Sequence, residues 1–553
     1  MKTKFFTIVL LAFIGLSSNT NAQSPNWIWA KSAGGTGSDW GKSISTDANG
    51  NSYITGYFSS PTITFGSTTL TNANPDSSDI FVVKYDGAGN VLWAKSAGGP
   101  IWDCGNSIST DANGNSYITG QFSSPTITFG STTLTNAGDN DIFVVKYDGA
   151  GNVLWAKSAG GTYTDSGNSI STDASGNSYI TGSFFSPTIT FGSTTLTNAG
   201  GSDIFVVKYD GAGNVLWAKS AGGTGSGIGT SISIDASGNS YITGYFFSPT
   251  ITFGSTTLTN AGSDDIFVVK YDGAGNVLWA KSAGGTNDDY GNSISTDANG
   301  NSYITGSFTS STIAFGSTTL TNTSASQSDL FVVKYDGAGN VLWAKSAGGN
   351  EYDYGYSIST NANGNSYITG GFGNSISFGN TTLTSGGSND IFVVKYDGAG
   401  NVLWAKSAGG TYSDFGSSIS IDANGNSYIT GGFSSPIITF GSTTLTTAGY
   451  RDVFLVKLDN ISGIAEDNEP SNAITIFPNP SNGKFTVNSK IKISKIEVIN
   501  VQGKKVYTSQ INTTQSIFEG LSTEIDLSNE SKGIYFVNII AGEKTYNSKI
   551  IIQ

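Results

Sequence analysis

Short segments in which apolar and polar residues alternate recur along most of the chain. Val, Ile, Thr, Tyr and Phe concentrate in these segments, and Gly, Asn and Asp separate them, which is typical of β-strands joined by tight turns. In the first copy they predict four strands, A to D, over residues 42–47, 52–58, 79–85 and 91–96. Residues 62–71 predict a small additional hairpin about a Gly-Ser turn. No segment sustains a 3.6-residue period, so the pattern predicts an all-β fold.

The heptapeptide Trp-Ala-Lys-Ser-Ala-Gly-Gly marks strand D of each copy. It begins at Trp29, Trp93, Trp155, Trp217, Trp279, Trp343 and Trp404, at intervals of 61–64 residues. A strand D stands first, at residues 26–32, and the last strand C, at 452–458, has no strand D after it. The N-terminal strand would therefore complete the last of seven sets. We predict a seven-bladed β-propeller closed by this exchange, because closure protects the sheet edges.

Composition and charge exclude several classes of function. With 27 Lys and Arg against 40 Asp and Glu, the net charge is −13, so no basic surface is expected for nucleic acid or anionic membranes. The chain has no His, and Cys104 is its only Cys. A disulfide framework, a Cys/His zinc site and a Ser-His-Asp triad are thereby excluded. Lys2 and Lys4 before an apolar run predict a secretory signal peptide over residues 1–22, and no other segment predicts a membrane span.

A second recurring motif carries a resemblance to a known family. Gly-Asn-Ser-Tyr-Ile-Thr-Gly begins at Gly50, Gly114, Gly176, Gly238, Gly300, Gly364 and Gly425. This motif, after an Asp-containing turn, resembles the β-propeller repeat proteins called SBBP. The resemblance covers residues 26–459 and implies a propeller at 23–459, but it implies no particular activity.

After the repeats, residues 460–473 are polar and predict a linker, and residues 474–553 predict a small β-sandwich. Pro478-Asn479-Pro480, Gly483, Gly503 and Gly533-Ile534-Tyr535 resemble the type A C-terminal sorting domain of the type IX secretion system of Bacteroidota. The resemblance implies that residues 474–553 interact with the secretion machinery. It also implies passage through the periplasm, removal of this domain near the linker, and either anchoring at the outer cell surface or release.

Differences between the copies gather in the D–A connections and before strand C, which share one face, while the scaffold stays nearly identical. Loops that vary over a constant scaffold are where binding sites usually lie; relaxed constraint in duplicated copies is the alternative. Six copies place an Asp two residues before a Gly, and Gly227 breaks the series. These residues are Asp39, Asp103, Asp165, Asp289, Asp353 and Asp414, followed in four copies by Trp40, Tyr290, Tyr354 and Phe415, with Trp102, Tyr163, Tyr352 and Tyr412 nearby.

Aromatic rings beside carboxylates are typical of sugar-binding surfaces. Two alternatives remain: each Asp caps its own turn while each aromatic packs on a neighbour, or the Asp ring holds Ca²⁺ as a cofactor. The Asp47-Ala48-Asn49-Gly50-Asn51 turn and its counterparts are interpreted as hairpin turns rather than calcium loops. Lys84 and its equivalents are interpreted as solvated strand positions.

Three functions are compatible with this sequence. The first is a secreted or cell-surface, non-enzymatic binding or adhesion module whose ligand is a glycan or a protein. The second is a carboxylate-based glycan-active enzyme, for which Glu351, the only Glu in a variable D–A connection, and Asp353 are the candidates. The third is a structural component of a surface or matrix.

Overall fold

The computed structural model describes residues 25–324, 326–460, 474–489, 493–500, 503–510, 521–541 and 544–553. The chain divides into two compact units, Ser24–Asn460 and a second unit that contains Ile461–Gln553. The predicted signal peptide lies outside the described residues, as does the predicted linker apart from its first residue.

The first repeat forms a four-stranded antiparallel sheet in the order β2-β3-β6-β7. Its strands are β2 (Asp39–Thr46), β3 (Ser52–Phe58), β6 (Asp79–Tyr85) and β7 (Val91–Ala97), and β4 (Thr62–Phe65) and β5 (Thr68–Thr71) form the additional hairpin. The four predicted strands and the hairpin are confirmed. The innermost strand begins three residues earlier than predicted, because Trp40 and Gly41 pair with Tyr57 and Gly56 before a register shift at Lys42.

The other repeats follow the same plan. The second has β8 (Asp103–Thr110), β9 (Ser116–Phe122), β10 (Thr126–Phe129), β11 (Thr132–Thr135), β12 (Asp141–Tyr147) and β13 (Val153–Ala159). The third has β14 (Asp165–Thr172), β15 (Ser178–Phe184), β16 (Thr188–Phe191), β17 (Thr194–Thr197), β18 (Asp203–Tyr209) and β19 (Val215–Ala221). The fourth has β20 (Gly227–Ile234), β21 (Ser240–Phe246), β22 (Thr250–Phe253), β23 (Thr256–Thr259), β24 (Asp265–Tyr271) and β25 (Val277–Ala283).

The fifth has β26 (Asp289–Thr296), β27 (Ser302–Phe308), β28 (Thr312–Phe315), β29 (Thr318–Thr321), β30 (Asp329–Tyr335) and β31 (Val341–Ala347). In the sixth, β32 (Asp353–Thr360), β33 (Ser366–Phe378), β34 (Thr381–Tyr396) and β35 (Val402–Ala408) form one sheet, and its hairpin is continuous with β33 and β34. The seventh has β36 (Asp414–Ile421), β37 (Ser427–Phe433), β38 (Ile437–Phe440), β39 (Thr443–Thr446) and β40 (Asp452–Leu458). Residues 25–460, apart from residue 325, thus hold seven four-stranded sheets.

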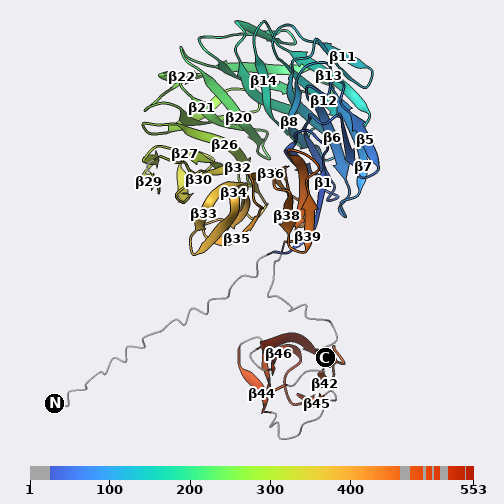
Figure 1. Cartoon of the computed structure of the whole chain (residues 1–553). Coiled ribbons are helices and arrows are strands. Elements are labelled where there is room, and N and C mark those ends of the chain that lie inside the picture. The colour runs from blue at the N-terminus through green and yellow to red at the C-terminus, as the bar shows by residue number, and fades with distance from the viewer. Residues whose placement is uncertain are drawn as a thin grey trace, which may run out of the picture. The chain divides into compact units, whose positions relative to one another are not determined.

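The innermost strands β2, β8, β14, β20, β26, β32 and β36 each contact the next one, and β36 contacts β2. Figure 1 shows the sheets arranged about a common centre, with these strands nearest to it. Apolar clusters fill the space between neighbouring sheets, so that Tyr53 and Ile80 of the first pack with Ile118 and Phe122 of the second. Each sheet therefore buries its faces against its neighbours, the main source of stability for stacked repeats.

The two ends of the repeat region meet in one sheet, of order β1-β40-β37-β36, in which β1 (Trp27–Ala33) pairs antiparallel with β40. The backbone N–H of Asn26 donates to Asp459 Oδ1 at 2.6 Å, and the Asp459 N–H donates to the Asn26 carbonyl at 3.0 Å. In addition, Tyr428 and Val453 of this sheet pack in one apolar cluster with Ile54 of the first sheet.

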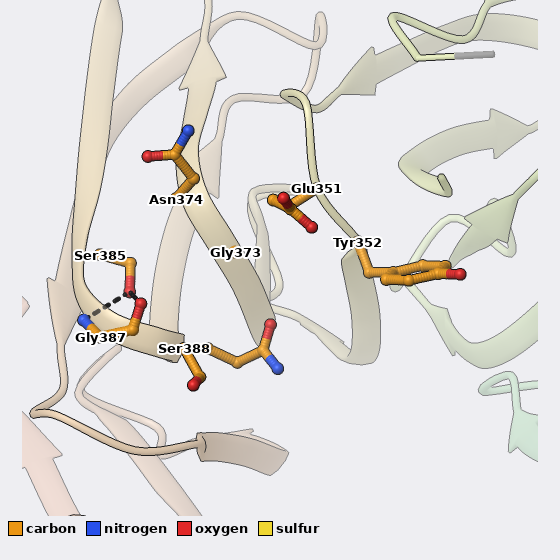
Figure 2. Close-up of a pocket in the computed structure, with 8 residues that line it drawn as sticks. Glu351, Tyr352, Gly373, Asn374, Ser385, Gly387 and Ser388 are labelled. Carbon is orange, nitrogen blue, oxygen red and sulfur yellow. Dashed lines mark hydrogen bonds between the residues drawn. The ribbon is translucent and has the colours of Figure 1, made fainter. Parts of the chain in front are cut away.

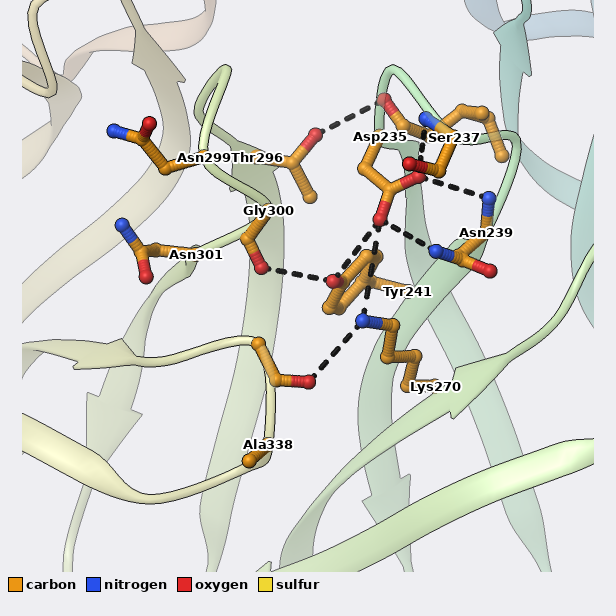
Figure 3. Close-up of polar contacts among 12 residues, drawn as sticks. Asp235, Ser237, Asn239, Tyr241, Lys270, Thr296, Asn299, Gly300, Asn301 and Ala338 are labelled. Atoms are coloured by element: carbon orange, nitrogen blue, oxygen red, sulfur yellow. Dashed lines mark hydrogen bonds and ion pairs between the residues drawn. The ribbon is translucent and has the colours of Figure 1, made fainter.

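Strand side chains that contact the A–B and C–D turns also join neighbouring sheets, as Figure 3 shows for the fourth and fifth repeats. Tyr241 donates to Asp235 Oδ2 at 3.2 Å and to the Gly300 carbonyl of the next sheet at 2.8 Å. Lys270 donates to the Gly337 carbonyl at 3.1 Å, and its Nζ lies 4.7 Å from the centre of the Tyr241 ring.

The sequence interpretation of these lysines as solvated was wrong. Lys84 and its equivalents Lys146, Lys270, Lys334 and Lys395 are buried. Each Nζ lies over the ring of a Tyr of its own sheet, where the aromatic face and carbonyl acceptors replace water. The hairpin interpretation of the Asp47 turn agrees with the structure, since Asp47 Oδ1 accepts from the Asn49 and Asn51 N–H groups at 2.9 Å.

The second unit contains a three-stranded sheet, β41-β42-β45, and a four-stranded sheet, β44-β43-β46-β47, around one apolar cluster. Its strands are β41 (Ile474–Phe477), β42 (Lys484–Ser489), β43 (Lys495–Asn500), β44 (Lys505–Gln510), β45 (Leu521–Asp526), β46 (Gly533–Ala541) and β47 (Lys544–Ile552). Among the described residues of both units there are strands and no helix, and therefore no helix that is suited to crossing a membrane.

Candidate functional site

The D–A and B–C connections leave each sheet at the same end. In the first repeat, Asp39 at the start of strand A lies opposite Phe58 at the end of strand B, which lies opposite Asp79 at the start of strand C. We call the surface formed by these connections the DA/BC face. It is the face on which the copies differ in sequence.

The DA/BC face carries all the large aromatic side chains that are exposed within the described part of residues 25–460. They are Trp102, Tyr163, Tyr352 and Tyr412 in D–A connections and Phe185, Phe247 and Tyr450 in B–C connections. Tyr163 is 54% exposed and Tyr352 is 44% exposed. Water-exposed aromatic rings that gather on one face are typical of a recognition surface.

The aspartates predicted for this site lie beneath it. Asp39 is 0% exposed; its Oδ1 accepts from the N–H groups of Ser59 and Ser60, and its Oδ2 accepts from Gly35 N–H at 2.9 Å and Ser60 Oγ at 2.6 Å. Asp103, Asp165, Asp289 and Asp414 are equally buried, with the same serine contact. Burial raises the pKa of Asp39, and these hydrogen bonds oppose that rise. The carboxylates thus bond both their own D–A connection, as in the capping alternative, and the B–C connection, which that alternative did not include, and they do not line the surface.

The aromatic residues that follow these aspartates are half-buried and pack on one another. The Trp40 ring is stacked on Phe415 at 6.1 Å, and the Arg451 guanidinium lies 4.1 Å from the centre of the Trp40 ring. Tyr290 meets the edge of Tyr245 at 4.7 Å. These contacts match the packing alternative for Trp40, Tyr290 and Phe415.

Tyr354 belongs to a different arrangement. Its ring is stacked between Tyr352, at 5.9 Å, and Tyr356, at 5.5 Å, in nearly parallel planes. Since Tyr352 is exposed and Tyr356 is half-buried, the stack extends from the surface of the DA/BC face into the sixth sheet.

Two pockets open on this face. One, of about 510 Å³, is lined by Asp139, Tyr163, Thr164 and Phe185. The other, of about 380 Å³, is lined by Glu351, Tyr352, Gly373, Asn374, Ser385, Gly387, Ser388 and Asn389 (Figure 2). Both volumes fall within the range of small-molecule sites, about 300–1,000 Å³.

Part of this surface was missed from the sequence. In the third and fourth copies a Phe-Phe-Ser-Pro segment has Phe185 and Phe247 as its second Phe, at the position of Ser59 and Ser123 in the first two copies. This replacement of Ser by Phe in a connection is the sequence feature that could have indicated exposed aromatic residues there. In the described part of the chain, no group of three or more Asp, Glu, His or Cys side chains is placed to hold a metal ion.

Comparison with known families identifies both parts of the chain. The family described as "Beta-propeller repeat" (SBBP) matches residues 28–57, 278–310 and 403–431. The "Secretion system C-terminal sorting domain" family matches residues 475–553. The chain therefore carries SBBP β-propeller repeats and a type IX sorting domain, which marks it for export to the outer surface or release.

Two curated relatives are similar over part of their length. An uncharacterized WD repeat-containing protein, L264, of Acanthamoeba polyphaga mimivirus is 25% identical over 510 residues, which cover 75% of this chain and 36% of that protein. The regulatory protein FlaEY of Caulobacter vibrioides is 30% identical over 110 residues, which cover 19% of this chain and 12% of that protein. The chain thus spans little more than a third of the longer match.

Solved structures with a similar arrangement include Sqt1 from Chaetomium thermophilum, with a TM-score of 0.34 and 9% identity over 78% of this chain and 98% of that one. YCF48 bound to a D1 peptide also has a TM-score of 0.34, with 10% identity over 80% of this chain and 99% of that one. Scores of this size support no inference about function.

Proposed function

We propose that the protein is an extracellular binding module, a seven-bladed β-propeller closed by β1, whose DA/BC face binds glycans. The observation that carries this proposal is the confinement of the exposed aromatic side chains of residues 25–460, as far as they are described, to that one face. The pairing of β1 with β40 and the contact of β36 with β2 support the closed ring.

The chemistry of the face supports a glycan ligand. The flat face of Tyr163 or Phe185 suits the apolar C–H side of a sugar ring. The neighbouring Asp139 carboxylate accepts hydrogen bonds from sugar hydroxyls, and the Thr164 hydroxyl both donates and accepts them. The acidic chain, with a net charge of −13, disfavours a polyanionic ligand.

Export supports a ligand outside the cell. We propose residues 1–22 as the signal peptide, 23–459 as the propeller, 460–473 as the linker and 474–553 as a β-sandwich that engages the secretion machinery. The last of these segments coincides with the sorting-domain match to within one residue.

A glycan array probed with the secreted chain, in calcium and again in chelator, tests this function. We expect saturable binding in both conditions, weakened at least tenfold in the double variant Tyr163→Ala/Phe185→Ala, because both rings of the larger pocket are removed. Leu154→Ser is the matched control, since Leu154 is exposed on the outer strand β13, away from the DA/BC face. A blank array from folded protein rejects glycan binding, and signal lost only in chelator assigns recognition to a bound cation.

One observation favours the alternative of a glycan-active enzyme. Burial raises the pKa of Asp353 to about 8, and the nearby Asp329 and Glu351 carboxylates add to the rise; a carboxyl group that stays protonated near neutral pH is what the general acid of such an enzyme requires. Release of reducing sugar from array-positive polysaccharides, abolished by Glu351→Gln, would establish that alternative. Self-association of the folded chain in the absence of any ligand would favour a structural role.

A further inference from the structure

The B–C connection of the sixth repeat differs from the other six. Between strand B and the hairpin turn, Gly379 follows Phe372 by seven positions, whereas Gly66 follows Phe58 by eight. The shorter connection lets β33 and β34 run on into the hairpin, with a register shift between Gly373 and Ser375. Asn374 lies at this bulge and has φ 52°, the only positive φ of a non-glycine residue in the described part of the chain. Bulges of this kind redirect side chains and are common beside binding sites.

The shortened connection removes a partner of the buried aspartate. In the other five repeats that have this aspartate, a serine hydroxyl donates to it. Here Gly349 N–H donates to Asp353 Oδ2 at 2.7 Å, and Oδ1 accepts no hydrogen bond although the residue is fully buried. Burying a carboxyl oxygen without a hydrogen-bond partner lowers the stability of the fold. The fourth repeat has Gly227 at the equivalent position, so the repeat does not require an aspartate there.

The same change opens the pocket of about 380 Å³. Asn389 pairs with Gly373 across the ladder, and a Cβ at Gly373 would lie 2.7 Å from Glu351 Cβ and 3.5 Å from Asn389 Oδ1. Glycine is therefore needed where Glu351 and Asn389 approach each other. Figure 2 shows Glu351, Asn374, Ser385 and Ser388 around the opening, with Tyr352 at its edge beyond Glu351 and its ring directed outwards.

The lining combines hydrogen-bond donors and acceptors without a cationic side chain. Asn374 and Asn389 offer both amide N–H donors and carbonyl acceptors, Ser385 and Ser388 offer hydroxyls, and Glu351 offers a carboxylate. Sugar hydroxyls both donate and accept, so they suit this mixture, and an anionic ligand would be repelled.

The stacked Tyr352, Tyr354 and Tyr356 provide a rigid aromatic edge for the apolar side of the sugar.

We infer that this pocket of the sixth repeat is the specificity subsite for one sugar residue of a neutral glycan, with Glu351, Asn374 and Asn389 binding its hydroxyls and Tyr352 covering its apolar side. The inference rests on the proposed glycan-binding function and adds to it a single pocket and an uncharged ligand. The other repeats contribute the aromatic surface along which the rest of the chain of sugars lies.

Calorimetric titration of the purified full chain tests the subsite with four neutral probes, namely oligosaccharides of β-1,4-glucan, α-1,4-glucan, mannan and xylan. Chitosan oligosaccharides and polygalacturonate serve as the cationic and anionic probes. We expect one or more neutral probes to bind, and we expect Glu351→Gln and Asn374→Gly each to weaken that binding at least tenfold. Glycine at 374 keeps the positive φ while removing the amide. Asn287→Ala, at the position of Glu351 in the preceding repeat, is the matched control and should bind like the wild type.

The outcomes separate this inference from the proposed function. Binding lost in Tyr163→Ala/Phe185→Ala but unchanged in Glu351→Gln and Asn374→Gly overturns the subsite and leaves the glycan-binding function standing. No binding of any probe overturns both. Tighter binding of the chitosan or polygalacturonate probe overturns the uncharged ligand. The unfolding temperature of each variant is measured as well. A value equal to that of the wild type shows that the variant is folded and that its loss of affinity is a loss of ligand contacts.

Discussion

Asp353 differs from the five equivalent aspartates in what its carboxyl contacts. Burial raises its pKa to about 8, against about 3.9 for an unfolded aspartate. Between these values the folded protein holds a proton that the unfolded chain has lost. The contribution of Asp353 to stability is therefore greatest at low pH and falls as pH rises towards 8.

Asp353→Asn removes this pH dependence while keeping the shape of the side chain. We expect the variant to unfold at nearly the same urea concentration as the wild type at pH 3, where the carboxyl is protonated in both the folded and the unfolded protein, and to become the more stable protein by about 1–3 kcal/mol near pH 9, the cost of an unpaired buried group. Urea unfolding followed by tryptophan fluorescence across this range measures the difference. Asp39→Asn is the control, because its carboxylate is hydrogen-bonded and its replacement should destabilise the protein at both pH values. If the difference in the free energy of unfolding between Asp353→Asn and the wild type did not increase with pH, the raised pKa of Asp353 would be contradicted.

Tyr and Lys side chains form hydrogen bonds between each sheet and the turns of the next sheet. Tyr241 on β21 donates to Asp235 of its own turn and to the Gly300 carbonyl of the next sheet, and the Lys270 ammonium lies over its ring. These side chains contact elements about 60 residues apart in the chain, so they couple sheets that the backbone joins only once.

Tyr241→Phe tests this coupling at the level of the element. The ring and its contact with Lys270 remain, but two acceptors lose their donor, and we expect a loss of about 1–2 kcal/mol. The urea midpoint of unfolding should fall accordingly. Tyr163→Phe removes a hydroxyl from an exposed ring and should leave the midpoint unchanged. Equal midpoints for the two variants would show that the interface does not depend on this hydrogen bond.

In the whole molecule, the proposed ring depends on β1. This strand covers the edge of β40, and its Ala30 belongs to the apolar cluster of the last sheet. Without it, the N–H and C=O groups of β40 would face water and invite pairing with another molecule.

Deletion of residues 23–33, with the signal peptide retained, tests closure. We expect the shortened chain to lose at least as much stability as a Trp→Ala core substitution, about 3–5 kcal/mol, and to self-associate in size-exclusion chromatography with light scattering. Deletion of residues 474–553 is the control, because it removes the other compact unit. A monomeric protein of unchanged stability would indicate that β1 does not close the ring.

The sequence was enough to predict the strands of the repeat, because alternation of side chains and turn chemistry are local properties. Residues 52–58 and 79–85 were predicted with the observed bounds. The early start of β2 at Asp39 was not, since Asp39 and Trp40 pair with strand B only across a bulge that the alternation does not show.

The sequence indicated the face that carries the candidate site, but not which of its side chains are exposed. The sequence by itself placed variation, aromatics and Glu351 in the connections of one face. It could not distinguish Asp39, which is buried under four hydrogen bonds, from Tyr163, which is exposed, because exposure depends on how the D–A and B–C connections fold onto each other. Likewise, only the tertiary structure brought Asn374 and Asn389 beside Glu351, more than 20 residues away in the chain, and only it placed Lys84 over an aromatic ring. Repeated local patterns therefore determined the strands of this protein, while contacts between distant segments decided which side chains are exposed on the DA/BC face.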